Sequence, residues 1–133
     1  MKKIFLFICF VFLSSSNSYA EIISIVCVDE KRSLEENRDV SIKLSFDEAG
    51  NWINVGNQKF IDGVKRDAGG EIIKLTRVDI NVNEIKLLHS DSILNILLDM
   101  RINRLDGSMS QKSMMVGKKY NFNYKCQKDN RAF

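Results

Sequence analysis

The chain of 133 residues is long enough for one hydrophobic core and leaves no room for a second domain. Its formal net charge is +3 and falls to +1 without Lys2 and Lys3, a value that argues against nucleic acid as a partner, because domains that bind nucleic acid usually carry a strongly basic face.

The first 20 residues have the three parts of a secretory signal peptide. Met1, Lys2 and Lys3 form a basic start, residues 4–13 are apolar, and Ser18 and Ala20 are the small residues of a cleavage site. The apolar run is shorter than the roughly 20 residues that a membrane-spanning helix needs, although a retained anchor is the alternative. We predict cleavage after Ala20, a mature single β domain of residues 21–133 and a periplasmic or secreted protein with no stable membrane anchor.

Cleavage changes the charge and the cysteine count. Loss of the leader lowers Lys plus Arg from 20 to 18 against 17 Asp plus Glu, a formal charge of +1. Cys9 leaves with it, so Cys27 and Cys126 are the two cysteines that remain. Exported proteins meet an oxidising environment, which favours one disulfide between them over two buried free thiols.

Most of the mature region has the composition and alternation of short β-strands. The clearest case is Val40, Ile42, Leu44 and Phe46, which alternate with polar residues. Strands are predicted at 21–28, 40–46, 52–55, 60–64, 71–82, 85–89, 93–104, in the run after Gly107 and at 120–126.

Three segments leave a choice. Residues 29–38 are charged, with Leu34 as one apolar residue, and a solvated loop is favoured over a helical turn. Residues 92–98 have a partly helical spacing, but the alternation that follows favours a strand from Ile93. The apolar phase changes within 71–82, which predicts a bulge or turn near Thr76 and Arg77.

Asp106 and Gly107 lie between two alternating runs. This pair is typical of a type I′ hairpin turn, in which both central residues have positive φ.

Regular turn signals and the lack of a long helical pattern predict an all-β fold. We expect a single antiparallel up-and-down barrel or sandwich of about eight strands, closed by the Cys27–Cys126 disulfide. In such a barrel the first and last strands are neighbours.

Side chains for catalysis are few. His89 is the one histidine, and a general base needs an orienting group and a nucleophile that no pattern here names. The carboxylates fall mostly in turns, where an acid pair held across a cleft is not expected. We therefore expect no catalytic residues, no metal site, no cofactor and no enzymatic activity, with His89 at a surface or strand edge.

Tyr120, Phe122 and Tyr124 occupy one face of the last strand. Such a stripe can stack on rings of a ligand, but the position of Cys126 on the same face favours a place in the core. Methionines 109, 114 and 115 on the preceding strand are expected to fill gaps in that core.

Cys27, the run from Ile102 to Gly107 and the final Tyr124-Lys125-Cys126 resemble a group of short exported bacterial all-β proteins with an Ile-x-Arg-x-x-Gly hairpin and a closing aromatic-x-Cys. The chain is also similar to periplasmic inhibitors of c-type lysozyme, which are small antiparallel barrels with a disulfide, and in size to the calycin type of ligand-binding barrel. The first resemblance implies no catalytic residue.

Together these features predict a non-enzymatic binding or interaction module of the bacterial cell envelope, whose partner is a protein or a small apolar ligand. The alternative is a periplasmic inhibitor of a secreted hydrolase such as lysozyme.

Export can be checked directly. The intact mass of the protein recovered from the periplasm of an expressing bacterium should correspond to residues 21–133. A mass that still includes residues 1–20 would contradict the leader and remove the argument for an oxidising compartment.

Overall fold

The computed structural model describes residues 22–128, so the predicted leader and its cleavage site lie outside the described residues. This part of the chain forms ten strands and one short helix, and the predicted all-β class is confirmed with ten strands rather than eight. The elements are β1 (Ile22–Val28), α2 (Glu30–Glu36), β2 (Ser41–Asp47), β3 (Trp52–Val55), β4 (Gln58–Ile61), β5 (Gly63–Arg66), β6 (Ile72–Ile80), β7 (Glu84–Asp91), β8 (Ile96–Asn103), β9 (Ser108–Met115) and β10 (Lys118–Lys128).

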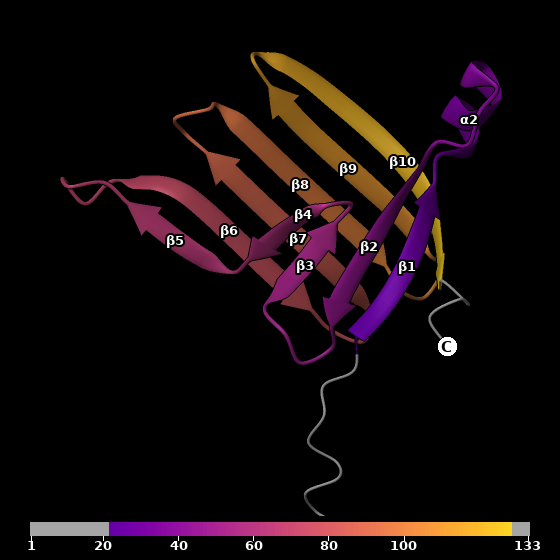
Figure 1. Ribbon diagram of the computed structural model, residues 1–133, viewed down its shortest axis with the longest axis horizontal. Helices are drawn as coiled ribbons and strands as arrows, with labels where there is room; N and C mark the ends of the chain where they lie inside the picture. Colours follow the sequence, from indigo (N-terminus) through magenta and orange to yellow (C-terminus); the bar gives the residue numbers. More distant parts are fainter. Residues whose placement is uncertain (1–21, 129–133) are drawn as a thin grey trace, which may run out of the picture.

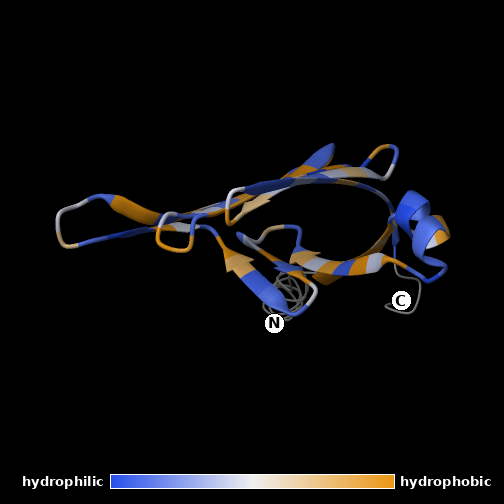
Figure 2. Cartoon of the chain, turned by 90° about the horizontal axis from the view of Figure 1, so that it is seen from above, coloured by the Kyte–Doolittle hydropathy of each residue, from blue (hydrophilic) through white to orange (hydrophobic). Residues whose placement is uncertain are grey.

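All ten strands belong to one antiparallel sheet in the order β4-β3-β2-β1-β10-β9-β8-β7-β6-β5 (Figure 1). Each neighbouring pair is consecutive in the chain except β1 and β10, as predicted for the first and last strands. The sheet folds back on itself into a nearly closed barrel, with α2 outside the end where β1 meets β10 (Figure 2).

The remaining gap in the barrel lies where β4 continues into β5. These two short strands follow each other in the chain and form opposite edges of the sheet. Asp62 lies between them, and its carboxylate accepts a hydrogen bond of 2.9 Å from the backbone N–H of Val78 on β6. The predicted single strand at 60–64 is therefore divided, because the chain crosses from one sheet edge to the other at this residue.

The barrel interior contains a hydrophobic core. Alternate residues of the strands point inward, and twelve of them are buried in one cluster: Ile23, Ile25, Cys27, Leu44, Phe46, Ile53, Phe60, Ile85, Leu87, Met100, Ile102 and Met109.

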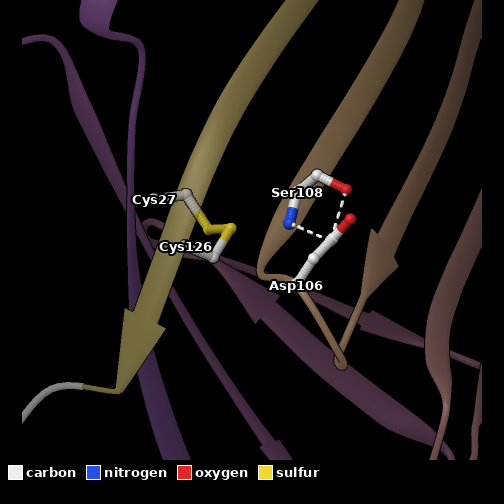
Figure 3. The surroundings of a disulfide bond; sticks show 4 residues. All are labelled: Cys27, Asp106, Ser108 and Cys126. Atoms are coloured by element: carbon white, nitrogen blue, oxygen red, sulfur yellow. Dashed lines mark hydrogen bonds between the residues drawn. A yellow bond between two sulfur atoms is a disulfide. The ribbon is translucent and has the colours of Figure 1, made fainter.

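The predicted disulfide is present at the closure (Figure 3). Cys27 and Cys126 are directly opposite each other on β1 and β10, with Cα atoms 3.9 Å apart. Cys27 is fully buried and belongs to the core cluster, so the bond lies against the core.

The hairpin after β8 is confirmed, but the predicted type I′ turn is wrong. Gly107 has φ +77°, whereas Asp106 is not among the residues with positive φ. The loop instead uses side-chain acceptors: the Asn103 amide oxygen accepts the N–H groups of Leu105 and Asp106 at 2.9 and 3.3 Å, and the Asp106 carboxylate accepts both the N–H and the hydroxyl of Ser108 (Figure 3).

The loop predicted at 29–38 is wrong, because residues 30–36 form the helix α2. Asp29 caps it by accepting a 3.0 Å hydrogen bond from the N–H of Arg32, and Asn37 ends it in the left-handed conformation. Leu34, the apolar residue of this helix, is 84% exposed and does not anchor it to the core.

Two boundaries also differ. The strand predicted from Ile93 begins at Ile96, since the Asp91 carboxylate accepts the N–H groups of Ile93 and Leu94 and fixes a turn there. The register irregularity of β6 lies opposite Lys65 and Arg66 rather than near Thr76.

Gly107 and Gly117 form a matched pair for testing the closure. Both have nearly the same φ, +77° and +76°, in hairpin loops. A Cβ at position 107 would lie 2.5 Å from the backbone oxygen of Cys126, whereas one at position 117 meets nothing within 4 Å. Gly117→Ala should cost about 1 kcal/mol from positive φ alone, and Gly107→Ala clearly more. Urea unfolding measures both, and equal losses would mean that β10 moves away from Gly107 without cost.

The disulfide joins residues 99 positions apart. Removing it with Cys27→Ser and Cys126→Ser should lower the free energy of unfolding by roughly 2–5 kcal/mol, because the unfolded chain gains freedom. Thiol titration of the unfolded, unreduced protein should find no free thiol from the two cysteines. Two titratable thiols in protein from an oxidising compartment would contradict the bond.

Candidate functional site

The first candidate site is a groove between α2 and residues 121–125 of β10. Its volume is about 500 Å³, and it is lined by residues 28–32 and Glu35 on one side and residues 121–125 on the other. We call it the α2–β10 groove.

The helix side of the groove is fixed by polar contacts rather than by apolar packing, since α2 has no buried residue. Besides the Asp29 cap, the hydroxyl of Ser33 donates to the Asp29 carbonyl at 2.7 Å and accepts the N–H of Val40 at 3.0 Å. Ser33 therefore connects the start of the helix to the start of β2, and it holds α2 at a fixed position beside the barrel.

Phe122 and Tyr124 of the aromatic stripe of β10 line the groove, and Tyr120 follows just outside the lining. The rings of Tyr120 and Phe122 are stacked with centroids 6.1 Å apart, and those of Phe122 and Tyr124 are tilted at 6.4 Å. The Arg32 guanidinium lies 4.5 Å from the centre of the Phe122 ring, a cation–π contact between α2 and β10.

The predicted core position of this stripe is only partly correct. Tyr124 packs against the buried cluster, and burial raises the pKa of its hydroxyl, with a further upward contribution from the Asp29 carboxylate and an opposing one from Arg32. Tyr120, two positions beyond Phe122, is 40% exposed. The stripe is therefore part of the core at Tyr124 and exposed at Tyr120.

The three methionines expected in the core are also only partly buried there. Met109 is buried in the core as predicted, while Met115 is exposed at the far end of β9. Met114 is on the opposite face of that strand from Met115.

His89 is not the surface or strand-edge residue expected from sequence. It is on the inward face of β7, where its Nδ1 is 2.8 Å from the Thr76 hydroxyl. The Phe60 ring packs edge-on against it with centroids 5.0 Å apart, across the gap between β4 and β6. Burial lowers the pKa of His89, with Lys74 acting in the same direction and Asp91 opposing.

Other hollows are less suited to a ligand. One of about 570 Å³ lies over β6–β8, where Asp99 and Arg101 pair with each other at 3.5 Å and the Asp62 carboxylate already caps Val78. Another, of about 320 Å³, lies beside the disulfide, where Arg104 pairs with Glu48 and lowers the pKa of that carboxyl.

Within residues 22–128, no three His, Cys, Asp or Glu side chains lie together so as to hold a metal ion. The only helix of this described part, α2, is too short to cross a membrane.

The predicted site residues Cys27, Cys126, Asp106 and Gly107 lie together at the closure and are not part of the lining of the α2–β10 groove. Arg32 was not predicted from the sequence, because its contact with Phe122 joins segments ninety positions apart. Comparisons with protein-family models, with curated sequences and with solved structures found no match.

The environment of His89 predicts a pH dependence of stability. Because burial holds the folded-state pKa of His89 below its ordinary value of 6.5, the unfolded chain binds a proton more readily. The contribution of neutral His89 is present above about pH 6.5 and is lost as the pH falls. Asp91 also has a lowered pKa, but its contribution is lost only below its ordinary value of 3.8.

Denaturant unfolding at pH 7 and pH 5 therefore isolates His89. The wild-type protein should lose stability between these values, and His89→Gln, which keeps a polar side chain that does not titrate, should lose less. If both proteins lose the same free energy of unfolding between pH 7 and pH 5, His89 has the same pKa in the folded and unfolded chain and the prediction is wrong.

Proposed function

We propose that this protein is an exported, non-enzymatic binding module of the bacterial cell envelope, and that the α2–β10 groove is its binding site. The observation that supports this most is the position of α2, a helix that contributes no buried residue and yet is held by Asp29 and Ser33 beside an exposed aromatic stripe. Because α2 contributes no buried residue to the core, its exposed surface is available to contact a partner.

The side chains of the groove suit recognition better than reaction. Phe122 and Arg32 offer a stacked pair, Asn121 and Asn123 offer amide groups, and Tyr120, next to the lining, offers an exposed ring. Aromatic rings and arginine are the side chains that contribute most at protein interfaces. His89, the residue best suited to acid–base chemistry, is bonded to Thr76 inside the barrel rather than in the groove.

Export is supported by the leader and by the disulfide, which persists in oxidising compartments. The periplasm or the extracellular space is thus the proposed location.

A periplasmic inhibitor of a secreted hydrolase is the second candidate. It is favoured by the β5–β6 hairpin, which projects beyond the rest of the barrel and in which all four residues of β5 are exposed (Figure 1). Peptidoglycan hydrolysis by a c-type lysozyme, with and without the mature protein, separates this candidate from the first.

Site-specific photo-crosslinking in the periplasm tests the groove. Benzoylphenylalanine placed at Glu35 or Asn121, which line opposite sides of it, should give a discrete adduct. The same residue at Arg101, exposed on the outer face of β8, is the control and should give none. The adduct at Asn121 should weaken in an Arg32→Ala background, because the stacked pair is lost. Adducts of equal yield at all three positions, or none at the two groove positions, would contradict the proposal.

A further inference from the structure

Strand β10 is longer than its partner on one side. It pairs with β9 from Lys118 to Lys125, but with β1 only from Lys125 to Lys128. Along residues 118–124, the edge that faces away from β9 has no strand beside it within the described chain.

The backbone groups on that open edge can be identified. The N–H of Cys126 donates to the carbonyl of Gly107, at 2.7 Å, and so points toward β9. Because backbone groups alternate in direction along a strand, residues 120, 122 and 124 also point toward β9. The N–H and C=O groups of Lys119, Asn121 and Asn123 therefore point away from it, and Asn121 and Asn123 line the α2–β10 groove.

The open edge exists because β1 leaves the sheet. Val28 is the last residue of β1 to pair with β10, and Asp29 then caps α2. The helix takes the chain away from the line of β1, and Arg32 reaches back to the face of Phe122 without pairing with the β10 backbone. The position beside residues 119–123 that β1 would occupy if it continued is therefore left open.

A row of alternating backbone donors and acceptors is matched by one kind of ligand, an extended polypeptide. Alternate side chains of such a strand would point to the inner face and meet the rings of Tyr120 and Phe122. The pairing would also run in line with the existing β1–β10 ladder.

A second copy of this chain fits less well. Its own β10 would bring β9 and the rest of its sheet to the far side of the new pair, where α2 lies. A single strand needs only the usual spacing of about 4.8 Å beside β10.

We propose that the α2–β10 groove binds an extended peptide segment of another protein, which adds to β10 as a strand by pairing with the backbone of Lys119, Asn121 and Asn123. This rests on the proposed function and specifies the partner and the mode of binding.

The probe is a library of random twelve-residue peptides displayed on phage. It is selected on the immobilised mature protein and counter-selected on the Arg32→Ala variant. A selected peptide is then synthesised with a single N-methyl group at each position in turn. Methylation should weaken binding about tenfold at every second residue, where a backbone donor faces β10, and much less at the others.

Amide hydrogen exchange gives a second readout on the unmodified protein. Without peptide, the amides of Lys119, Asn121 and Asn123 should exchange quickly, whereas those of Tyr120 and Phe122 are protected by β9. With peptide, the first three should become protected.

A matched pair of variants tests the same bonds from the protein side. Asn121→Pro removes a donor that β9 does not use, and Asn121→Ala keeps it. The first should abolish peptide binding and the second should retain it. If the proline variant does not fold, the methylation series decides.

Strand addition is overturned if a peptide shifts the NMR signals of Arg32 and Phe122 but tolerates methylation at every position. The amides of Lys119, Asn121 and Asn123 would then also stay unprotected when the peptide is bound. Strand addition is also overturned if selection yields no peptide that depends on Arg32. In either case an adduct at Asn121 would leave the proposed function standing, whereas loss of that adduct would refute the function itself.

Discussion

Pairing between β1 and β10 is the constraint on which the rest of the barrel depends. Every other pair of neighbouring strands is consecutive in the chain, so a local connection is enough to bring its members together. Only β1 and β10 must find each other across the whole domain, and the Cys27–Cys126 bond lies within their short ladder. Without this pairing the strands would form two separate meanders joined only at Asp62, and the two halves of the buried cluster would no longer face each other.

The same pairing determines where the candidate site lies. β1 covers only the last residues of β10, and beyond Val28 the chain turns into α2. Along β10, Tyr124 packs on the core, Phe122 lies under Arg32 and Tyr120 is 40% exposed. One strand thus passes from a structural role to a surface role within five residues. This explains why an aromatic stripe that looks like core in the sequence is only partly core in the structure.

Much of the fold was predictable because it depends on local patterns. Period-2 alternation located most strands, and the two cysteines that follow the predicted leader allowed one pairing. What was missed depends on contacts between distant segments. α2 contacts Phe122, ninety positions away from Arg32, and the setting of His89 depends on Phe60 across the gap in the barrel. The turn at Val116 and Gly117 has positive φ at both residues, but valine is among the residues least expected there. The groove itself exists because β10 extends beyond the end of β1. No sequence pattern predicts this difference in strand length.

The position of the disulfide also has a topological consequence. Residues 27–126 form a covalent ring, and the gap in the sheet at Asp62 falls within that ring. A single cut by a protease at the exposed tip of the β5–β6 hairpin would open the backbone but release no fragment, because both pieces stay attached through sulfur. Each piece would also keep its own side of the β1–β10 ladder. A barrel built as a ring can therefore be cut once and remain a single molecule.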